Sequence, residues 1–218
     1  MGELLQFVVV RHWRLALGAA ALFASGLLAS VPVGLCRIRA VEWLPLKALR
    51  LVLKLMGPRP ALWRMAALIW AFNSAAIFLY MASGFHPAPP MIFAAWTGLN
   101  VGLVLAASRR RDEGSAWELG RPLGGWVPPA WLALACGALV VVLELPCFWY
   151  AIAMGISMGR GVMNGLGYLD LLAPRALAYA AFIVPSLLVS AAAEAVAVRA
   201  GLTAEDASPG HPGGAPAA

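Results

Sequence analysis

The sequence predicts an all-α fold: a polytopic membrane helix bundle with about five transmembrane helices and one amphipathic interfacial helix. Of the 218 residues, 62% are hydrophobic and only 12% are charged, which is too apolar for an ordinary globular domain. Several apolar runs are longer than about 18 residues, enough to cross a hydrocarbon core of about 30 Å. The runs are continuous rather than alternating, which favours helices over the strands of a barrel.

The apolar runs define the expected spans. They lie at about 15–35, 62–84, 91–107, 128–158 and 175–198. The short segment 85–90 predicts that the second and third spans are antiparallel neighbours. Residues 159–174 are expected to form a loop. We expect residues 1–198 to form a single membrane domain, and the Gly-, Pro- and Ala-rich residues 199–218 to form a disordered tail.

A basic amphipathic helix is expected at about 40–57, between the first two spans. Lys47, Arg50 and Lys54 recur at three- and four-residue spacing beside apolar residues. This periodicity is typical of a helix lying along a membrane surface. Two interpretations stay open: a solvated linker helix, which such flanking segments commonly form, and a docking surface for a partner.

The net charge of +6 does not indicate nucleic-acid binding, because the basic residues flank the spans rather than form a compact basic domain. Five spans place twelve Lys and Arg residues on the side of residues 36–64 and four on the side of the N-terminus. The positive-inside rule then puts residues 36–64 in the cytoplasm and the N-terminus outside. A re-entrant fourth span at Pro146 would move the last span and the tail to the other side.

No cofactor or metal is expected. Cys36, Cys136 and Cys147 follow no metal-ligand or disulfide spacing and are interpreted as small packing residues. The sequence also lacks the glycine-rich phosphate-binding and dinucleotide-binding patterns.

Polar side chains inside the expected spans are the first candidates for a functional site. They are Asn73, Thr97, Asn100, Glu144 and Glu194. One interpretation is an ion or proton path, since intramembrane acids often mark one. The other is a structural network in which Glu144 bonds to Asn73 or Asn100 on neighbouring helices. The structural network is favoured, because Glu144 is the only acid deep in a span and Glu194 lies near a span end.

Glycines four residues apart predict close contacts between helices. These positions are Gly98, Gly102, Gly155 and Gly159. Pro146 and Pro185 predict bends in the fourth and fifth spans. Gly155-Ile-Ser157-Met-Gly159 also matches the G-x-S-x-G pattern of serine hydrolases, with His86 as the candidate base nearest a span. That pattern needs a strand-to-helix turn, so a packing face is the favoured interpretation.

The order and spacing of several short elements resemble one bacterial family over residues 15–198. The elements are Phe72-Asn73, Pro89-Pro90 followed by Thr97-Gly98-Leu-Asn100-Val-Gly102, Glu144-Leu-Pro146 with Gly155 and Gly159 behind it, and Ile183-Val-Pro185 through Glu194. This arrangement is similar to that of the stage II sporulation protein M family of multi-span membrane proteins.

The resemblance implies a non-enzymatic protein of the bacterial cytoplasmic (inner) membrane. Its expected function is a scaffold or partner-recruiting subunit of a cell-envelope complex, with the lipid bilayer and membrane or envelope proteins as partners. A homo-oligomer is a further expectation. The alternative is a permease-type subunit working with a separate ATPase, and an intramembrane hydrolase is a distant third.

Overall fold

The computed structural model describes residues 2–35, 61–109 and 129–206, together with the single positions 47, 51, 54 and 55. Its elements are α1 (Gly2–Leu35), α3 (Leu62–Ala82), α4 (Ala88–Arg109), α5 (Ala130–Met163), α6 (Tyr168–Ala178), the π-helix η1 (Tyr179–Ile183) and α7 (Val184–Asp206). These described segments are helical and contain no strand, which confirms the predicted all-α fold.

Five helical segments are long and apolar enough to cross a membrane. They are Val10–Val33, Leu62–Ala82, Ala88–Ala106, Leu134–Met163 and Tyr168–Arg199. The last of them runs through α6, η1 and α7 without a break. The bundle therefore has the five spans that the sequence predicts, and the chain is a multi-pass membrane protein.

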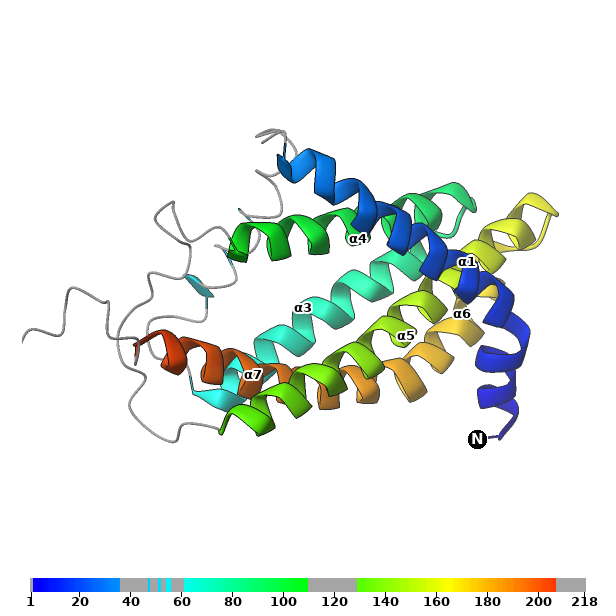
Figure 1. Ribbon diagram of the computed structural model, residues 1–218. Coiled ribbons are helices and arrows are strands. Elements are labelled where there is room, and N and C mark those ends of the chain that lie inside the picture. Colours follow the sequence, from blue (N-terminus) through cyan, green and yellow to red (C-terminus); the bar gives the residue numbers. More distant parts are fainter. Residues whose placement is uncertain are drawn as a thin grey trace, which may run out of the picture.

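The helices form two groups (Figure 1). α1 lies beside α4, and the two run in the same direction, because Gly98 of α4 meets Phe23 of α1 and Gly102 meets Ser30. α3, α5, α6, η1 and α7 pack together on the other side of the bundle. We call these the α1–α4 pair and the α3–α5–α7 group.

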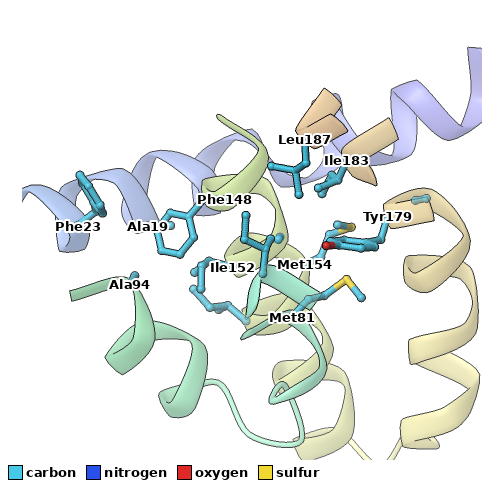
Figure 2. Close-up of a cluster of buried hydrophobic side chains, with 14 residues drawn as sticks. Ala19, Phe23, Met81, Ala94, Phe148, Ile152, Met154, Tyr179, Ile183 and Leu187 are labelled. Atoms are coloured by element: carbon cyan, nitrogen blue, oxygen red, sulfur yellow. The ribbon is translucent and has the colours of Figure 1, made fainter. Parts of the chain in front are cut away.

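The main hydrophobic core lies where the pair and the group meet (Figure 2). Ala19 and Phe23 enter it from α1 and Ala94 from α4, while α5 contributes Phe148 and Ile152 among others. A smaller cluster joins Met65 and Ile69 of α3 to Ala191 and Ala195 of α7. The bundle thus has one core shared by all its spans and a second one inside the α3–α5–α7 group.

The prediction that the second and third spans are close neighbours is wrong for most of their length. α3 and α4 diverge from the turn that joins them (Figure 1), and α4 packs mainly against α1. The short turn makes the two helices antiparallel, but the glycines of α4 face α1. Packing chemistry, rather than loop length, therefore selects the neighbour.

The loop predicted at 159–174 is largely helical. α5 ends at Met163, and Leu166 N–H donates to Gly161 O while Gly165 N–H donates to Val162 O. This is a Schellman motif with Gly165 at φ 84°, a conformation that glycine adopts without steric cost. α6 begins at Tyr168, directly after the turn 164–167, and contains Pro174.

α5 passes through Pro146 as one helix from Ala130 to Met163, so the alternative of a re-entrant fourth span is wrong. α7 continues beyond the predicted span end at Val198 to Asp206, so the first residues of the expected disordered tail are helical. Residues 207–218 lie outside the described residues. So does most of the amphipathic helix predicted at 40–57, of which the described positions 47, 51, 54 and 55 are helical.

Candidate functional site

Three helices bring polar side chains together in the middle of the α3–α5–α7 group. Asn73 Nδ2 of α3 donates a hydrogen bond to Glu144 Oε1 of α5 over 2.9 Å. Ser190 Oγ of α7 donates to Glu144 Oε2 over 3.4 Å. We call these three residues the polar junction. Because both carboxyl oxygens have a partner on another helix, Glu144 links all three helices at one depth.

Glu194 lies one helical turn beyond Ser190 on α7, so the two share a face of that helix. Its side chain is half-buried. Because Ser190 bonds to Glu144, Glu194 lies on the side of α7 that faces α5. Two carboxylates in a water-poor setting are costly to ionise together, so neutral donors around them matter for their stability.

Thr97 and Asn100 do not take part in the polar junction. Both lie on α4, and Asn73 rather than Asn100 is the amide that bonds to Glu144. Within the described part of the chain, the buried atoms Thr97 Oγ1 and Asn100 Oδ1 have no hydrogen-bond partner. A buried polar atom without a hydrogen-bond partner costs free energy. Thr97 Oγ1 and Asn100 Oδ1 therefore do not stabilise the bundle through hydrogen bonds to the described residues.

Three further hydrogen bonds join α3 to the last span along its length. Trp70 Nε1 donates to Val184 O over 3.2 Å, and Tyr179 Oη donates to Ser74 O over 2.6 Å. Tyr168 Oη donates to Ala82 O near the end of α3. Each bond uses an aromatic side chain of one helix and a backbone carbonyl of the other, which fixes the register of the two helices.

The π-helix η1 explains how Pro185 fits into the last span. Proline has no N–H, and its ring clashes with the carbonyl four residues earlier, so a regular α-helix cannot continue unchanged. Here Val184 N–H donates to Tyr179 O, a bond of the wider π type, immediately before Pro185. The extra residue in this turn changes which side of α7 faces the group, and Ser190 then meets Glu144.

Glycines hold the α1–α4 pair at backbone contact. A Cβ atom on Gly98 would meet Phe23 O and Leu27 N, and one on Gly26 would meet Ala95 O. Gly102 lies equally close to the Ser30 side chain. These positions of α1 and α4 cannot carry a larger side chain unless the helices separate.

Gly155 and Gly159 make close contacts with the turn between α3 and α4. Gly84 of this turn packs on the backbone of Gly155, and a Cβ on Gly159 would meet the backbone of His86 and Pro87. The predicted small-residue face of the fourth span thus contacts the turn between α3 and α4 as well as the end of α3.

Ser157 does not have the geometry of a hydrolase nucleophile. It lies inside the continuous helix α5, where no strand-to-helix turn exposes it. Arg175 of α6 donates from Nη2 to Ser157 Oγ over 3.1 Å and from Nη1 to Leu171 O over 2.6 Å. His86 Nδ1 accepts the backbone N–H of Ala88 over 3.1 Å at the start of α4. In the described residues, no group of three or more His, Cys, Asp or Glu side chains could hold a metal ion.

The sequence did not reveal two residues of these sites. Ser190 is buried and bonds to Glu144, and its position four residues before Glu194 is the signal that could have found it. Arg175 is 7% exposed. From the sequence it lies at the edge of an expected span and is one of the four Lys and Arg residues on the N-terminal side of the membrane. Only the helical course of residues 168–178 explains its burial.

The fold and the polar junction define the chain as a polytopic α-helical membrane protein whose intramembrane polar residues bond to one another across helices. Residues 58–198 match the model of a family described as Stage II sporulation protein M. The chain belongs to this family, as its short sequence elements suggested. No curated protein matches the chain, and no solved structure does.

Proposed function

We propose that the chain is a non-catalytic scaffold or partner-recruiting subunit of a cell-envelope complex in the bacterial cytoplasmic membrane. The observation that carries this proposal is the polar junction. Asn73 and Ser190 each engage one carboxyl oxygen of Glu144, so this acid serves to join three helices. Polar groups used in this way stabilise a membrane bundle without any chemical step.

Membership of the family supports the same proposal, because the resemblance implies a scaffold rather than an enzyme. The helical arrangement of Ser157 and its bond to Arg175 speak against the hydrolase, the third candidate. Membrane or envelope proteins are the partners we propose, together with the surrounding lipid.

One observation favours the permease-type subunit as a second candidate. Glu194 lies one helical turn beyond Ser190, which bonds to Glu144, and acids on facing helices inside a membrane can carry protons or cations. In this alternative the polar junction would bind a transported ion and a separate ATPase would complete the transporter.

Flux into membrane vesicles that carry the full chain together with any partner ATPase, measured with and without ATP, tests the choice. The scaffold proposal expects no flux above that of vesicles lacking the chain, both for the native chain and for Glu144→Gln. A flux that Glu144→Gln abolishes, and that the surface control Leu134→Ala leaves intact, would establish the permease instead.

A second measurement addresses the partner directly. Cross-linking of the full chain in native membranes, followed by purification in mild detergent, should yield a stoichiometric membrane or envelope protein. A chain that purifies alone and monomeric after cross-linking would contradict the scaffold proposal.

A further inference from the structure

We infer that residues 160–170, the tip of the hairpin formed by α5 and α6, are the docking surface for an apolar, acid-bearing segment of another membrane or envelope protein. We call these residues the hairpin tip. They comprise the end of α5, the turn 164–167 and the start of α6. The surface would serve the scaffold function proposed above, on which the inference rests, because it is where the partner would bind.

The hairpin tip extends past the turn that joins α3 to α4 (Figure 1). Gly84 of this turn packs on Gly155 of α5, and a Cβ atom on Gly159 would meet the backbone of His86. The turn is therefore level with this part of α5. At a rise of about 1.5 Å per residue, Met163 lies about 6 Å beyond Gly159. The hairpin thus continues outward for about one further helical turn.

The length of α3 shows where this end lies in a bilayer. α3 has 21 residues and is about 31 Å long, which matches a hydrocarbon core of about 30 Å. Trp63, which is 75% exposed in its first turn, suits the opposite interface, where tryptophan is enriched. The headgroups add only about 5–8 Å on each side. The hairpin tip therefore reaches the outer part of the headgroup layer, where lipid tails do not cover apolar side chains.

Three large apolar side chains are nevertheless exposed on the hairpin tip. Met163 is 64% exposed, Leu166 56% and Leu169 73%. Lipid tails would cover such side chains in the middle of a span, but at this depth they meet water and headgroups. Apolar side chains that gather on a surface in contact with water are typical of a protein-interaction site.

The hairpin tip is already held in one conformation. Leu166 N–H donates to Gly161 O over 3.0 Å, and a Cβ atom on Gly161 would meet the Leu171 side chain, so α5 and α6 pack closely there. The Tyr168 hydroxyl donates to Ala82 O and ties the start of α6 to α3. A surface that is ordered before binding loses little conformational entropy when a partner docks.

The charges of the hairpin tip indicate the chemistry of the partner. Arg160, in the last turn of α5, is exposed. The Asp170 carboxylate lies against Gly167 at the start of its own helix, where it stabilises the helix dipole. Arg160 is therefore the charge directed to a partner, and an Asp or Glu beside apolar side chains complements it. The positive-inside rule predicts that this end of the bundle faces the envelope.

Site-specific photo-cross-linking of the full chain in native membranes tests this inference. A benzophenone amino acid replaces Leu169. In the control it replaces Leu177, which is 59% exposed and lies eight residues further along the last span. We expect the label at Leu169 to give one discrete adduct with another protein, and the label at Leu177 to give adducts with lipid. Mass spectrometry should locate the Leu169 adduct in an apolar peptide that contains Asp or Glu.

Charge reversal then tests the role of Arg160. Arg160→Glu should lower the yield of the Leu169 adduct about tenfold, whereas Arg160→Lys should keep it. Replacing the acid of the captured peptide by Lys should restore the yield with Arg160→Glu. If Arg160→Glu does not reach native amounts in the membrane, Arg160→Gln replaces it and should also lower the yield.

Four results would overturn the docking surface: adducts with lipid alone, an adduct with a second copy of this chain, an equal protein adduct from Leu177, or a yield that does not depend on the charge of Arg160. The scaffold proposal is tested separately by cross-linking over the whole chain. A partner found there but not at Leu169 would overturn this surface and leave the scaffold proposal standing.

Discussion

The α1–α4 pair and the α3–α5–α7 group hold their helices together by different means within one bundle. In the pair, glycines remove side chains so that two backbones touch. In the group, amide, hydroxyl and indole donors reach acceptors on neighbouring helices. Lipid tails are as apolar as leucine, so burial of apolar surface alone does not drive helices together in a membrane. Close packing and hydrogen bonding are the two remaining means. The pair relies on the first, whereas the group adds hydrogen bonds to the glycine contacts of α5.

The difference has a mechanical meaning. Glycine contacts depend on shape and fail when any larger atom is inserted, whereas a hydrogen-bonded helix pair can lose one bond and keep the others. We therefore expect substitutions to be tolerated unequally in the two regions. Four changes test this contrast, from the largest expected effect to the smallest.

Gly98→Ile should have the largest effect. The new side chain would collide with Phe23 O and separate α1 from α4, at a cost of about 3 kcal/mol in the free energy of unfolding. Denaturant unfolding in detergent micelles, followed by tryptophan fluorescence, measures it. Gly18→Ile is the matched control, because nothing lies within 4 Å of a Cβ there. Equal stabilities of the two variants would show that the pair does not depend on its glycine contacts.

Glu144→Ala should destabilise the α3–α5–α7 group by about 2 kcal/mol, because it leaves the half-buried Asn73 donor and the buried Ser190 donor without an acceptor. Glu144→Gln keeps an acceptor for Asn73 and should cost less than about 1 kcal/mol. The same unfolding assay compares them. If glutamine were as harmful as alanine, the charge of Glu144, rather than its hydrogen bonds, would hold the junction.

Thr97→Val should leave the chain equally stable or stabilise it by about 1 kcal/mol, because it replaces a buried hydroxyl that has no hydrogen-bond partner in the described residues by a methyl of the same shape. Ser190→Ala, which removes a bonded hydroxyl, should act in the opposite direction. Thermal unfolding in nanodiscs reports both signs. A clear loss of stability in Thr97→Val would mean that its hydroxyl has a partner in the membrane.

Tyr179→Phe should have the smallest effect, about 0.6 kcal/mol, the average contribution of one hydrogen bond between membrane helices. It removes the bond to Ser74 O and keeps the ring against Phe78, whose centroid is 5.4 Å away. Tyr80→Phe, which keeps its stacking on Phe93, is the control. A loss of several kcal/mol would show that the register of α3 against η1 depends on this single bond.

Sequence reasoning was most reliable for the features that the lipid bilayer requires of a membrane span. A span must be apolar and helical, so the five spans and the all-α fold could be predicted from composition and run length. The contact between Asn73 and Glu144 was one of two predicted alternatives, because a carboxylate in a membrane helix needs a donor and only a few exist. The glycines of α4 predicted a close contact with another helix. They did not predict which helix, since several could have packed against them.

Other features depend on three-dimensional detail that one sequence does not show. Glycine and proline between 159 and 174 predicted a loop, yet Gly165 only caps α5, and Pro174 is accommodated inside α6. Ser190 was overlooked because a serine among alanines resembles ordinary packing, and only the π-turn before Pro185 brings it to Glu144. The sequence predicts Arg175 only as one of the charges on the N-terminal side of the membrane, because its hydrogen bond to Ser157, a residue of another helix, requires the fold.

The pairing of α1 with α4 also sets an order of assembly during synthesis. α1 is complete once the ribosome has passed Leu35, but its partner is not made until Arg109. At about 5–20 residues per second, the glycine-containing face of α1 waits several seconds without its partner. α3 waits longer still for α7, whose backbone accepts the Trp70 bond. The first helix of this chain must therefore remain in the membrane, held by lipid or by the insertion machinery, before the bundle that contains it exists.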